Sequence, residues 1–246
     1  MKTTATQLST YWTCPYLWHV SYEKREPLPV WGRRRRFGTV IHAAIAEYER
    51  RGRSLERALL LLDDQSGGLS REDLGEARSI LVWRHEQAPH REGRPLLVEG
   101  SLRAFLGGHR IDVRMDRLDG MGEDLLLAEY KGGTHVDLRQ VGTQLAILAY
   151  AVLDVFGRAP GRWELELLRA RKRLDLPAET DPGRLRRLPL RLIERILEGD
   201  REPRPYDPAF CSRCPAKAFC PRWTPTPRAF SRSASPSAPQ HQLTLF

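Results

Sequence analysis

Two neighbouring stretches decide the fold: His109-Arg-Ile-Asp-Val-Arg-Met-Asp116-Arg-Leu-Asp119 and, six residues later, Leu125-Leu-Leu-Ala-Glu129-Tyr-Lys131. Each alternates or runs apolar like a strand, and Glu129 and Lys131, two residues apart, share one face. A carboxylate and an ammonium at the end of a buried strand cost desolvation. A divalent cation held by Asp116 and Glu129 would compensate for that cost. An ordinary salt bridge between Glu129 and Lys131 explains these residues equally well.

The pattern on either side of these stretches alternates between helical and strand periods. It predicts helices over residues 7–22, 37–51, 54–62, 70–86, 137–156 and 188–197, the first of them interrupted by Pro15. It predicts strands over 96–106, 109–118, 125–131 and 163–171. The chain from residue 224 onward is rich in Pro, Ser, Thr and Arg and is expected to be a flexible tail. The predicted organisation is one domain over residues 1–223, a linker over 224–241 and a short terminal peptide over 242–246.

Composition limits the possible functions. The chain has 246 residues, 41% hydrophobic and 29% charged, which excludes a wholly disordered protein. It contains no run of 18 apolar residues and no apolar leader, so we expect a cytoplasmic protein without a membrane span. A net charge of +9 suits a polyanionic partner, most simply nucleic acid. Only five of the 40 basic residues are Lys, which makes Lys131 conspicuous.

The four cysteines predict a metal centre. Cys211, Cys214 and Cys220 form a Cys-x₂-Cys-x₅-Cys cluster, and Cys14 is the only other thiol in the chain. A cytoplasmic protein is not expected to keep structural disulfides. Four thiolates suit either tetrahedral zinc or a [4Fe–4S] cluster, and spacing alone favours zinc.

An ordered set of motifs gives a family resemblance. The motifs are Gln7-Leu-Ser-Thr-Tyr-Trp-Thr-Cys14-Pro15, Gly38-Thr-Val-Ile-His42, Arg114-Met-Asp116-Arg-Leu-Asp119, Glu129-Tyr-Lys131-Gly132-Gly133 and Gln144-Leu-Ala-Ile-Leu-Ala-Tyr150. In this order, and with the cysteine spacing, the chain resembles the PD-(D/E)XK nuclease superfamily from Gln7 to about Trp223. The resemblance is to its RecB-like branch with an iron–sulfur cluster, which includes the AddB nuclease domain and the CRISPR-associated exonucleases.

The resemblance implies an α/β fold with a restriction-endonuclease-like core, in which helices flank a central mixed sheet. It implies that Mg²⁺ or Mn²⁺ is held by His42, Asp116, Glu129 and the carbonyl of Tyr130. It makes Lys131 catalytic and gives Gln144 a hydrogen bond to the site or the substrate. It also favours a [4Fe–4S] cluster over zinc on Cys14, Cys211, Cys214 and Cys220, as a staple that joins the two ends of the domain.

Two positions depart from the family pattern. The tyrosine expected four residues after Gln144 is Leu148, and Tyr150 lies on a different helical face, so the usual role of this tyrosine is in doubt. Gly132 replaces the threonine that commonly follows the catalytic lysine. Neither change removes a metal ligand.

The function expected from these features is a metal-dependent DNA nuclease, an exonuclease on single-stranded or end-bearing DNA in repair or recombination. The DNA backbone would be bound by four consecutive arginines, Arg33, Arg34, Arg35 and Arg36. A helicase or recombination protein is a candidate partner. The alternatives are a nucleic-acid-binding module without catalysis and a zinc-stapled adaptor. The intact set of Asp116, Glu129 and Lys131 argues against a binding module without catalysis. The colour of the protein would distinguish the zinc-stapled adaptor, because an iron–sulfur protein is brown and a zinc site is colourless.

The last five residues suggest a further partner. Gln242, Leu243, Leu245 and Phe246 resemble the peptide by which proteins bind the bacterial sliding clamp. Leu245 and Phe246 would fill an apolar pocket, with Gln242 bonded at its rim. A chance apolar terminus is the alternative, because a match of five residues is short.

Overall fold

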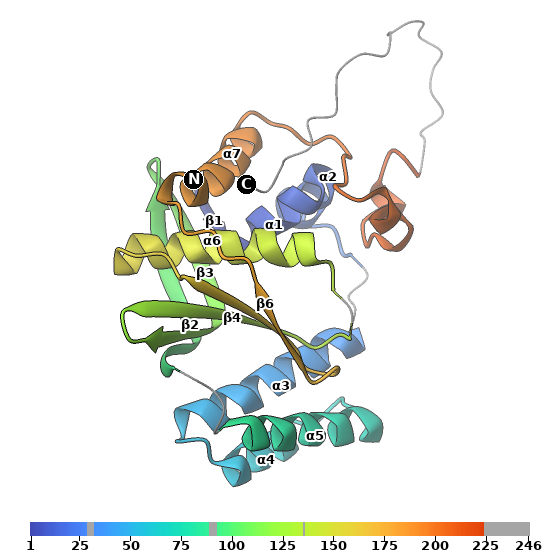
Figure 1. Ribbon diagram of the computed structural model, residues 1–246. Coiled ribbons are helices and arrows are strands. Elements are labelled where there is room, and N and C mark those ends of the chain that lie inside the picture. The colour runs from blue at the N-terminus through green and yellow to red at the C-terminus, as the bar shows by residue number, and fades with distance from the viewer. Residues whose placement is uncertain (29–31, 89–92, 135, 224–246) are drawn as a thin grey trace, which may run out of the picture.

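The protein, seen here in a computed structural model, is built around one six-stranded mixed sheet (Figure 1). The structure describes residues 1–28, 32–88, 93–134 and 136–223. The strand order is β1-β3-β4-β5-β6, with β2 paired to the other edge of β3. Strands β1 and β3 are parallel, as are β4 and β5, and the remaining pairs are antiparallel. The strands are β1 (Lys2–Thr4), β2 (Arg94–Leu106), β3 (His109–Met121), β4 (Asp124–Lys131), β5 (Arg162–Leu167) and β6 (Lys172–Leu176).

Helices cover both faces of this sheet (Figure 1). On one face lie α1 (Ala5–Thr13), α6 (Leu138–Phe156) and α7 (Pro182–Leu197). On the other lie α3 (Gly32–Arg50), α4 (Leu55–Asp64) and α5 (Arg71–Gln87). The short helix α2 (Pro15–Trp18), a π-helical turn (His19–Glu23) and two 3₁₀ turns (Pro208–Arg213 and Lys217–Phe219) stand at one end. None of the helices in these described ranges has the length and apolarity that a membrane crossing needs.

The alternation in the central strands produces two cores. Leu125 and Leu127 face the core under α6, whereas Ala128 and Tyr130 face the core against α3 and α5. Helix α6 is almost wholly apolar because it is covered by the sheet on one side and by α1 and α7 on the other. The predicted α/β fold with a mixed, helix-flanked sheet is therefore confirmed.

Several predicted boundaries were wrong. The expected helix over residues 7–22 begins at Ala5. The interruption expected at Pro15 is present, because the extended backbone of Cys14 ends α1 and α2 starts at Pro15. The expected strand over 163–171 ends at Leu167, and the chain turns back into β6, which was not predicted. Helix α7 begins at Pro182 instead of 188, because Asp181 caps it. Strand β1 was also missed, because three residues carry too short a pattern to recognise.

A buried ion network lies between the sheet and α3 and α5. Arg84 of α5 is 2% exposed and donates hydrogen bonds to Glu166 of β5, to Glu49 of α3 (3.0 Å) and to the hydroxyl of Tyr130 (3.2 Å). Arg117 of β3 is fully buried; it pairs with Glu49, and its Nε donates to Asp119 at 2.6 Å. The network joins three strands and two helices behind the strand that carries Glu129 and Lys131.

Removing one member of this network should destabilise the protein strongly. Arg84→Met removes a buried cation that Glu166 and Glu49 share, and breaking a buried pair costs about 3–5 kcal/mol of unfolding free energy. Arg78→Met, on the same helix, removes only a half-exposed pair with Asp63 and should cost at most about 1 kcal/mol. Urea denaturation of both variants measures the difference. Equal losses would show that the network contributes no more than a surface pair.

Candidate active site

The site begins at a gap in the pairing of β3. Strand β1 pairs with residues 110–112 of β3 and β4 pairs with 117–121, both along the edge opposite β2. Along that edge, no strand in the described ranges pairs with residues 113–116. The last pair between β3 and β4 is Arg117 with Ala128, so Asp116 and Glu129 are the next residues on each strand, just where the two strands separate. The backbone N–H of Tyr130 donates a hydrogen bond to Oδ2 of Asp116 at 2.6 Å. The Asp116 side chain thus accepts the bond that a backbone carbonyl of a paired strand would otherwise accept.

A kink in the β2–β3 hairpin brings a second carboxylate to the same place. Glu99 has a φ of 46°, in the left-handed region, and the pairs on either side of it place it opposite Asp116. Met115 and Leu118 both contribute to the core under α6, although an unbroken strand would turn residues three apart to opposite faces. Such local irregularities re-aim side chains. Here the kink turns both Glu99 and Asp116 toward α3.

Helix α3 supplies the third group. Nδ1 of His42 lies 2.8 Å from Oε1 of Glu99 and 3.1 Å from Oδ1 of Asp116. The ligand atoms of these three residues lie within 4.8 Å of one another, as in a metal site. The other oxygen of Glu99 is bonded to Arg114 at 2.8 Å. We call His42, Glu99 and Asp116 the metal triad.

A second group of side chains forms a closed triangle beside it. Nζ of Lys131 donates to Oε1 of Glu129 at 2.7 Å and to Oε1 of Gln144 at 2.9 Å. Nε2 of Gln144 donates to the same Glu129 oxygen at 2.8 Å. Gln144 lies on α6, so the triangle ties the end of β4 to that helix. Each side chain satisfies the others in a place where an unpaired charge would be costly.

The electrostatics separate the roles of these residues. Burial raises the pKa of Asp116, but the hydrogen bond and charge of His42, the backbone N–H of Tyr130 and the charge of Lys131 together outweigh it, and the net pKa is below its usual value. Burial and the nearby Asp116 raise the pKa of Glu129. Burial lowers the pKa of Lys131, but Glu129 and Asp116 together raise it more, so the ammonium stays protonated. Two carboxylates with pKa values pushed apart are typical of acid–base chemistry.

The structure brings together His42, Asp116, Glu129, Lys131 and Gln144, all of which the sequence singled out. The ring centroid of Tyr130 lies 5.9 Å from that of His42. Tyr150 is buried away from them and donates a hydrogen bond to the carbonyl of Phe105 at 2.6 Å, so its role is to hold β2 against α6. The side chains of Arg33, Arg34 and Arg35 lie outside the described residues. Arg36 donates hydrogen bonds to the carbonyls of Gln65 and Gly67.

Glu99 is the residue that the sequence analysis missed. Its signal is weak but present, because Gly100 follows it and interrupts the strand alternation. An isolated glycine in a strand indicates a bulge or a close backbone approach. A Cβ on Gly100 would meet Cβ of Leu97 at 3.0 Å. A Glu-Gly pair in the strand directly before the Asp116 strand could therefore have been recognised as a candidate.

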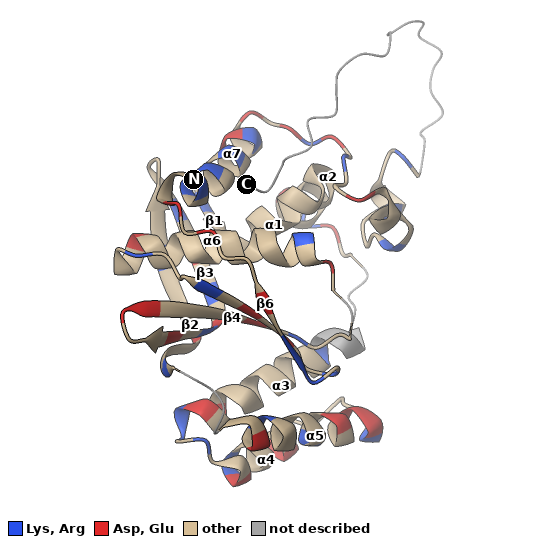
Figure 2. Ribbon diagram, in the orientation of Figure 1, with Lys and Arg blue, Asp and Glu red and all other residues tan. Residues whose placement is uncertain are grey.

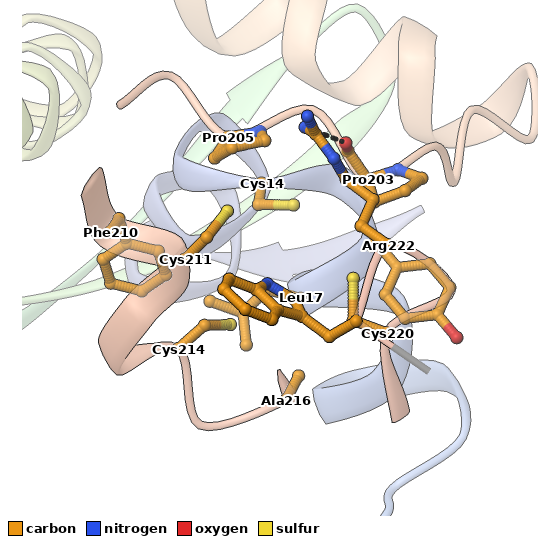
Figure 3. Close-up of a pocket in the computed structure, with 12 residues that line it drawn as sticks. Cys14, Leu17, Pro203, Pro205, Phe210, Cys211, Cys214, Ala216, Cys220 and Arg222 are labelled. Atoms are coloured by element: carbon orange, nitrogen blue, oxygen red, sulfur yellow. Dashed lines mark hydrogen bonds between the residues drawn. The ribbon is translucent and has the colours of Figure 1, made fainter. Parts of the chain in front are cut away.

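The four cysteines surround one pocket, away from the metal triad (Figure 3). Cys14 comes from the α1–α2 junction, and Cys211, Cys214 and Cys220 come from the 3₁₀ turns near the end of the described chain. Among the apolar lining residues are Leu17, Phe210 and Ala216. Burial raises the pKa of the Cys14 thiol above its usual value, because it outweighs the backbone N–H groups of Leu17 and Tyr16, which lower it. The pocket thus brings four sulfurs together within an apolar wall.

The family model described as the PD-(D/E)XK nuclease superfamily matches residues 2–221. The chain belongs to that superfamily. Among solved structures, it is similar to one described as "Putative exonuclease" from Eubacterium rectale, at 11% identity and a TM-score of 0.49, covering 94% of this chain and 90% of that one. It is also similar to the crystal structure of SSO0001, at 16% identity and a TM-score of 0.43, covering 91% and 87%. No curated protein matches.

Membership in this superfamily places the chain among phosphodiesterases, and the residues beside the gap in β3 are the ones to test. Burial lowers the pKa of His42, but hydrogen bonds to Asp116 and Glu99 raise it more, to about 10. A raised pKa means that protonated His42 stabilises the fold fully below its ordinary value of 6.5. That contribution is lost as the pH rises toward 10.

Chelator-treated protein should therefore lose the stabilisation by His42 between pH 6.5 and 10. The measurement is the melting temperature of the wild type minus that of His42→Gln across this range. The difference should shrink as the pH rises. A difference that stays constant with pH would show that His42 is not protonated between the two carboxylates.

Proposed function

We propose that the protein is a divalent-metal-dependent DNA nuclease that hydrolyses phosphodiester bonds. The observation that carries the proposal is the metal triad of His42, Glu99 and Asp116 beside the triangle of Glu129, Lys131 and Gln144. A cation-binding side and a proton-donating side adjoin one another, as hydrolysis of an anionic ester requires. That the enzyme is an exonuclease, acting on single-stranded or end-bearing DNA in repair or recombination, rests on the resemblance to the RecB-like branch.

The separations in the metal triad fit a small octahedral cation. Ligands at about 2.0–2.1 Å from Mg²⁺ stand about 3.0 Å apart when they are adjacent. The separations of 2.8 and 3.1 Å from His42 Nδ1 to the two carboxylate oxygens match this value. One imidazole with carboxylates suits Mn²⁺ as well as Mg²⁺. We therefore assign Glu99 to the cation, with Glu129 and the carbonyl of Tyr130 as further candidates.

The bound cation would polarise the scissile phosphate and lower the pKa of a coordinated water. The chain's own residues do the remainder. Lys131 keeps its proton and donates hydrogen bonds to a non-bridging phosphate oxygen as negative charge builds up. Gln144 holds the Lys131 ammonium in place. Glu129, with its raised pKa, is suited to accept a proton from the attacking water, whose oxygen bonds to phosphorus as the leaving ester oxygen departs and is protonated.

Charge around the site suits an anionic strand. Figure 2 shows Lys and Arg at the turn between β5 and β6, next to α3. In this turn, the guanidinium of Arg169 stacks 4.0 Å from the Phe37 ring of α3. Arg114 is largely exposed beside Glu99. We propose that these residues, together with Arg33–Arg36, bind DNA phosphates.

We further propose that the cysteine pocket holds a [4Fe–4S] cluster. Four thiols in one apolar pocket fit a four-thiolate centre. Zinc fits the same four sulfurs. The choice of the cluster over zinc rests on the family resemblance.

Loss of the catalytic residues should abolish cleavage and leave DNA binding intact. Asp116→Ala removes a metal ligand, and Lys131→Ala removes a transition-state donor, so each should lower kcat at least about a hundredfold. Asp112→Ala is the matched control, because it removes a half-buried carboxylate from the same strand, one that pairs with Arg110 and lies outside the metal triad. Activity is measured as cleavage of end-labelled DNA with Mg²⁺ or Mn²⁺. DNA binding is measured by fluorescence anisotropy. Near-wild-type activity of Asp116→Ala and Lys131→Ala would contradict the assignment and favour a binding module.

Each cysteine should be needed for the second centre. Replacing Cys14 or Cys214 with Ser should lower iron content and soluble yield together, because the centre joins the two ends of the domain. Iron analysis and absorption near 400 nm, about where iron–thiolate centres absorb, distinguish a brown cluster from colourless zinc. Full iron content in Cys14→Ser would remove Cys14 from the ligand set.

A last element of the proposal concerns the terminal peptide. Gln242, Leu243, Leu245 and Phe246 lie outside the described residues, and we propose from sequence alone that they bind the bacterial sliding clamp. The expected dissociation constant is about micromolar, because a short peptide loses entropy when it orders on binding. Calorimetry with a peptide covering residues 238–246 tests this. Equal heat after Leu245 and Phe246 are both changed to Ala would exclude the clamp.

A further inference from the structure

One residue links the cysteine centre to the active-site helix. Asp137 is the N-cap of α6, and its Oδ1 accepts the backbone N–H groups of Arg139 (2.9 Å) and Gln140 (3.2 Å). Its other oxygen, Oδ2, accepts a hydrogen bond from the hydroxyl of Tyr206. Tyr206 lies in the segment that leads from α7 to the cysteine cluster. One carboxylate thus caps the helix and holds a distant part of the chain.

Tyr206 is itself fixed to the end of α1. Its backbone N–H donates to the carbonyl of Thr13 at 3.1 Å, and its ring stacks on Trp12 with centroids 4.2 Å apart. Thr13 is 2% exposed and directly precedes Cys14. Its hydroxyl oxygen accepts a hydrogen bond from Nε2 of Gln140 at 3.4 Å. Two segments that carry cluster cysteines therefore meet the first turn of α6 at one point.

This point lies close to the catalytic groups along the chain. Asp137 comes six residues after Lys131 and seven before Gln144. Seven residues are two turns of helix, so Asp137 and Gln144 share one face of α6. Gln144 depends on the placement of α6 for its hydrogen bonds to Lys131 and Glu129. A small shift of the first turns would move its amide away from both.

We propose that Tyr206 is a positioning residue that ties the cysteine-bearing segments to α6 and thereby holds Gln144 against Lys131 and Glu129. The proposal rests on the function proposed above for those two residues. It makes the cysteine centre a support for catalysis through a defined contact, in addition to its contribution to overall stability. The metal triad lies on α3, β2 and β3, so the contact should leave cation binding unchanged.

The first test follows the helix directly. In Tyr206→Phe, amide hydrogen exchange in a peptide covering residues 136–144 should be faster by about tenfold, as expected for loss of a hydrogen bond to a carboxylate. Asp137→Ser keeps a good N-cap but cannot reach Tyr206, and should have the same effect. Tyr11→Phe is the matched control, because its hydroxyl bonds the Asp200 carbonyl and does not touch α6. Unchanged exchange in both Tyr206→Phe and Asp137→Ser would overturn the proposal.

The second test separates positioning from general weakening. Tyr206→Phe should lower kcat about five- to thirtyfold, with KM for DNA and the Mn²⁺ concentration for half-maximal activity unchanged. In a Gln144→Ala background, the same substitution should have no further effect on kcat, because the residue it positions is gone. Additive losses in the double variant, or a shifted Mn²⁺ requirement, would overturn the proposal.

The two tests also separate this proposal from the proposed function. A wild-type protein that cleaves no DNA would refute the nuclease assignment, while the exchange experiment would still decide whether Tyr206 holds α6. Faster exchange with unchanged kcat in an active enzyme would show that the contact does not position Gln144, and would overturn the proposal.

Discussion

The active site depends on a gap in the pairing of one strand. Strand β3 is covered along one edge by β2, but its other edge is shared by β1 and β4, which leave residues 113–116 between them. A backbone N–H at the end of a buried strand needs an acceptor. Tyr130 finds it in the side chain of Asp116, and this bond fixes the carboxylate at the point where β4 ends in Glu129 and Lys131. The kink at Glu99 then brings a second carboxylate next to Asp116 and His42.

Two groups of buried charges lie on the α3 side of the sheet. Arg84 and Arg117 pair with Glu49, Glu166 and Asp119 in an enclosed network. On the same side, Asp116 and Glu99 share the imidazole of His42, and Arg114 pairs with the other oxygen of Glu99. Buried carboxylates are costly without positive partners, so a cation would stabilise this second group. Toward α6, Glu129 is instead held by Lys131 and Gln144.

Much of this arrangement could be predicted from the sequence. The alternation around Asp116 and the apolar run before Glu129 predicted the two strands, and the order of the motifs predicted the grouping of His42 with Asp116 and of Gln144 with Lys131. The strand patterns are local in the sequence, and the motifs follow one another in the order known for the family. Glu99, Glu49 and Arg84 could not be predicted in their roles. Each acts through a partner far away in sequence, and a kink or a buried ion pair leaves almost no periodic signal.

The most direct test of the account is the position of a bound Mn²⁺. Crystals of the full chain grown with Mn²⁺ would locate the ion by its anomalous scattering. The account predicts Mn²⁺ within about 2.0–2.4 Å of His42, Asp116 and Glu99, with Lys131 and Gln144 nearby and not bonded to it. An ion held by Glu129 with Glu99 turned away toward Arg114, or no ion in the gap beside β3, would contradict it.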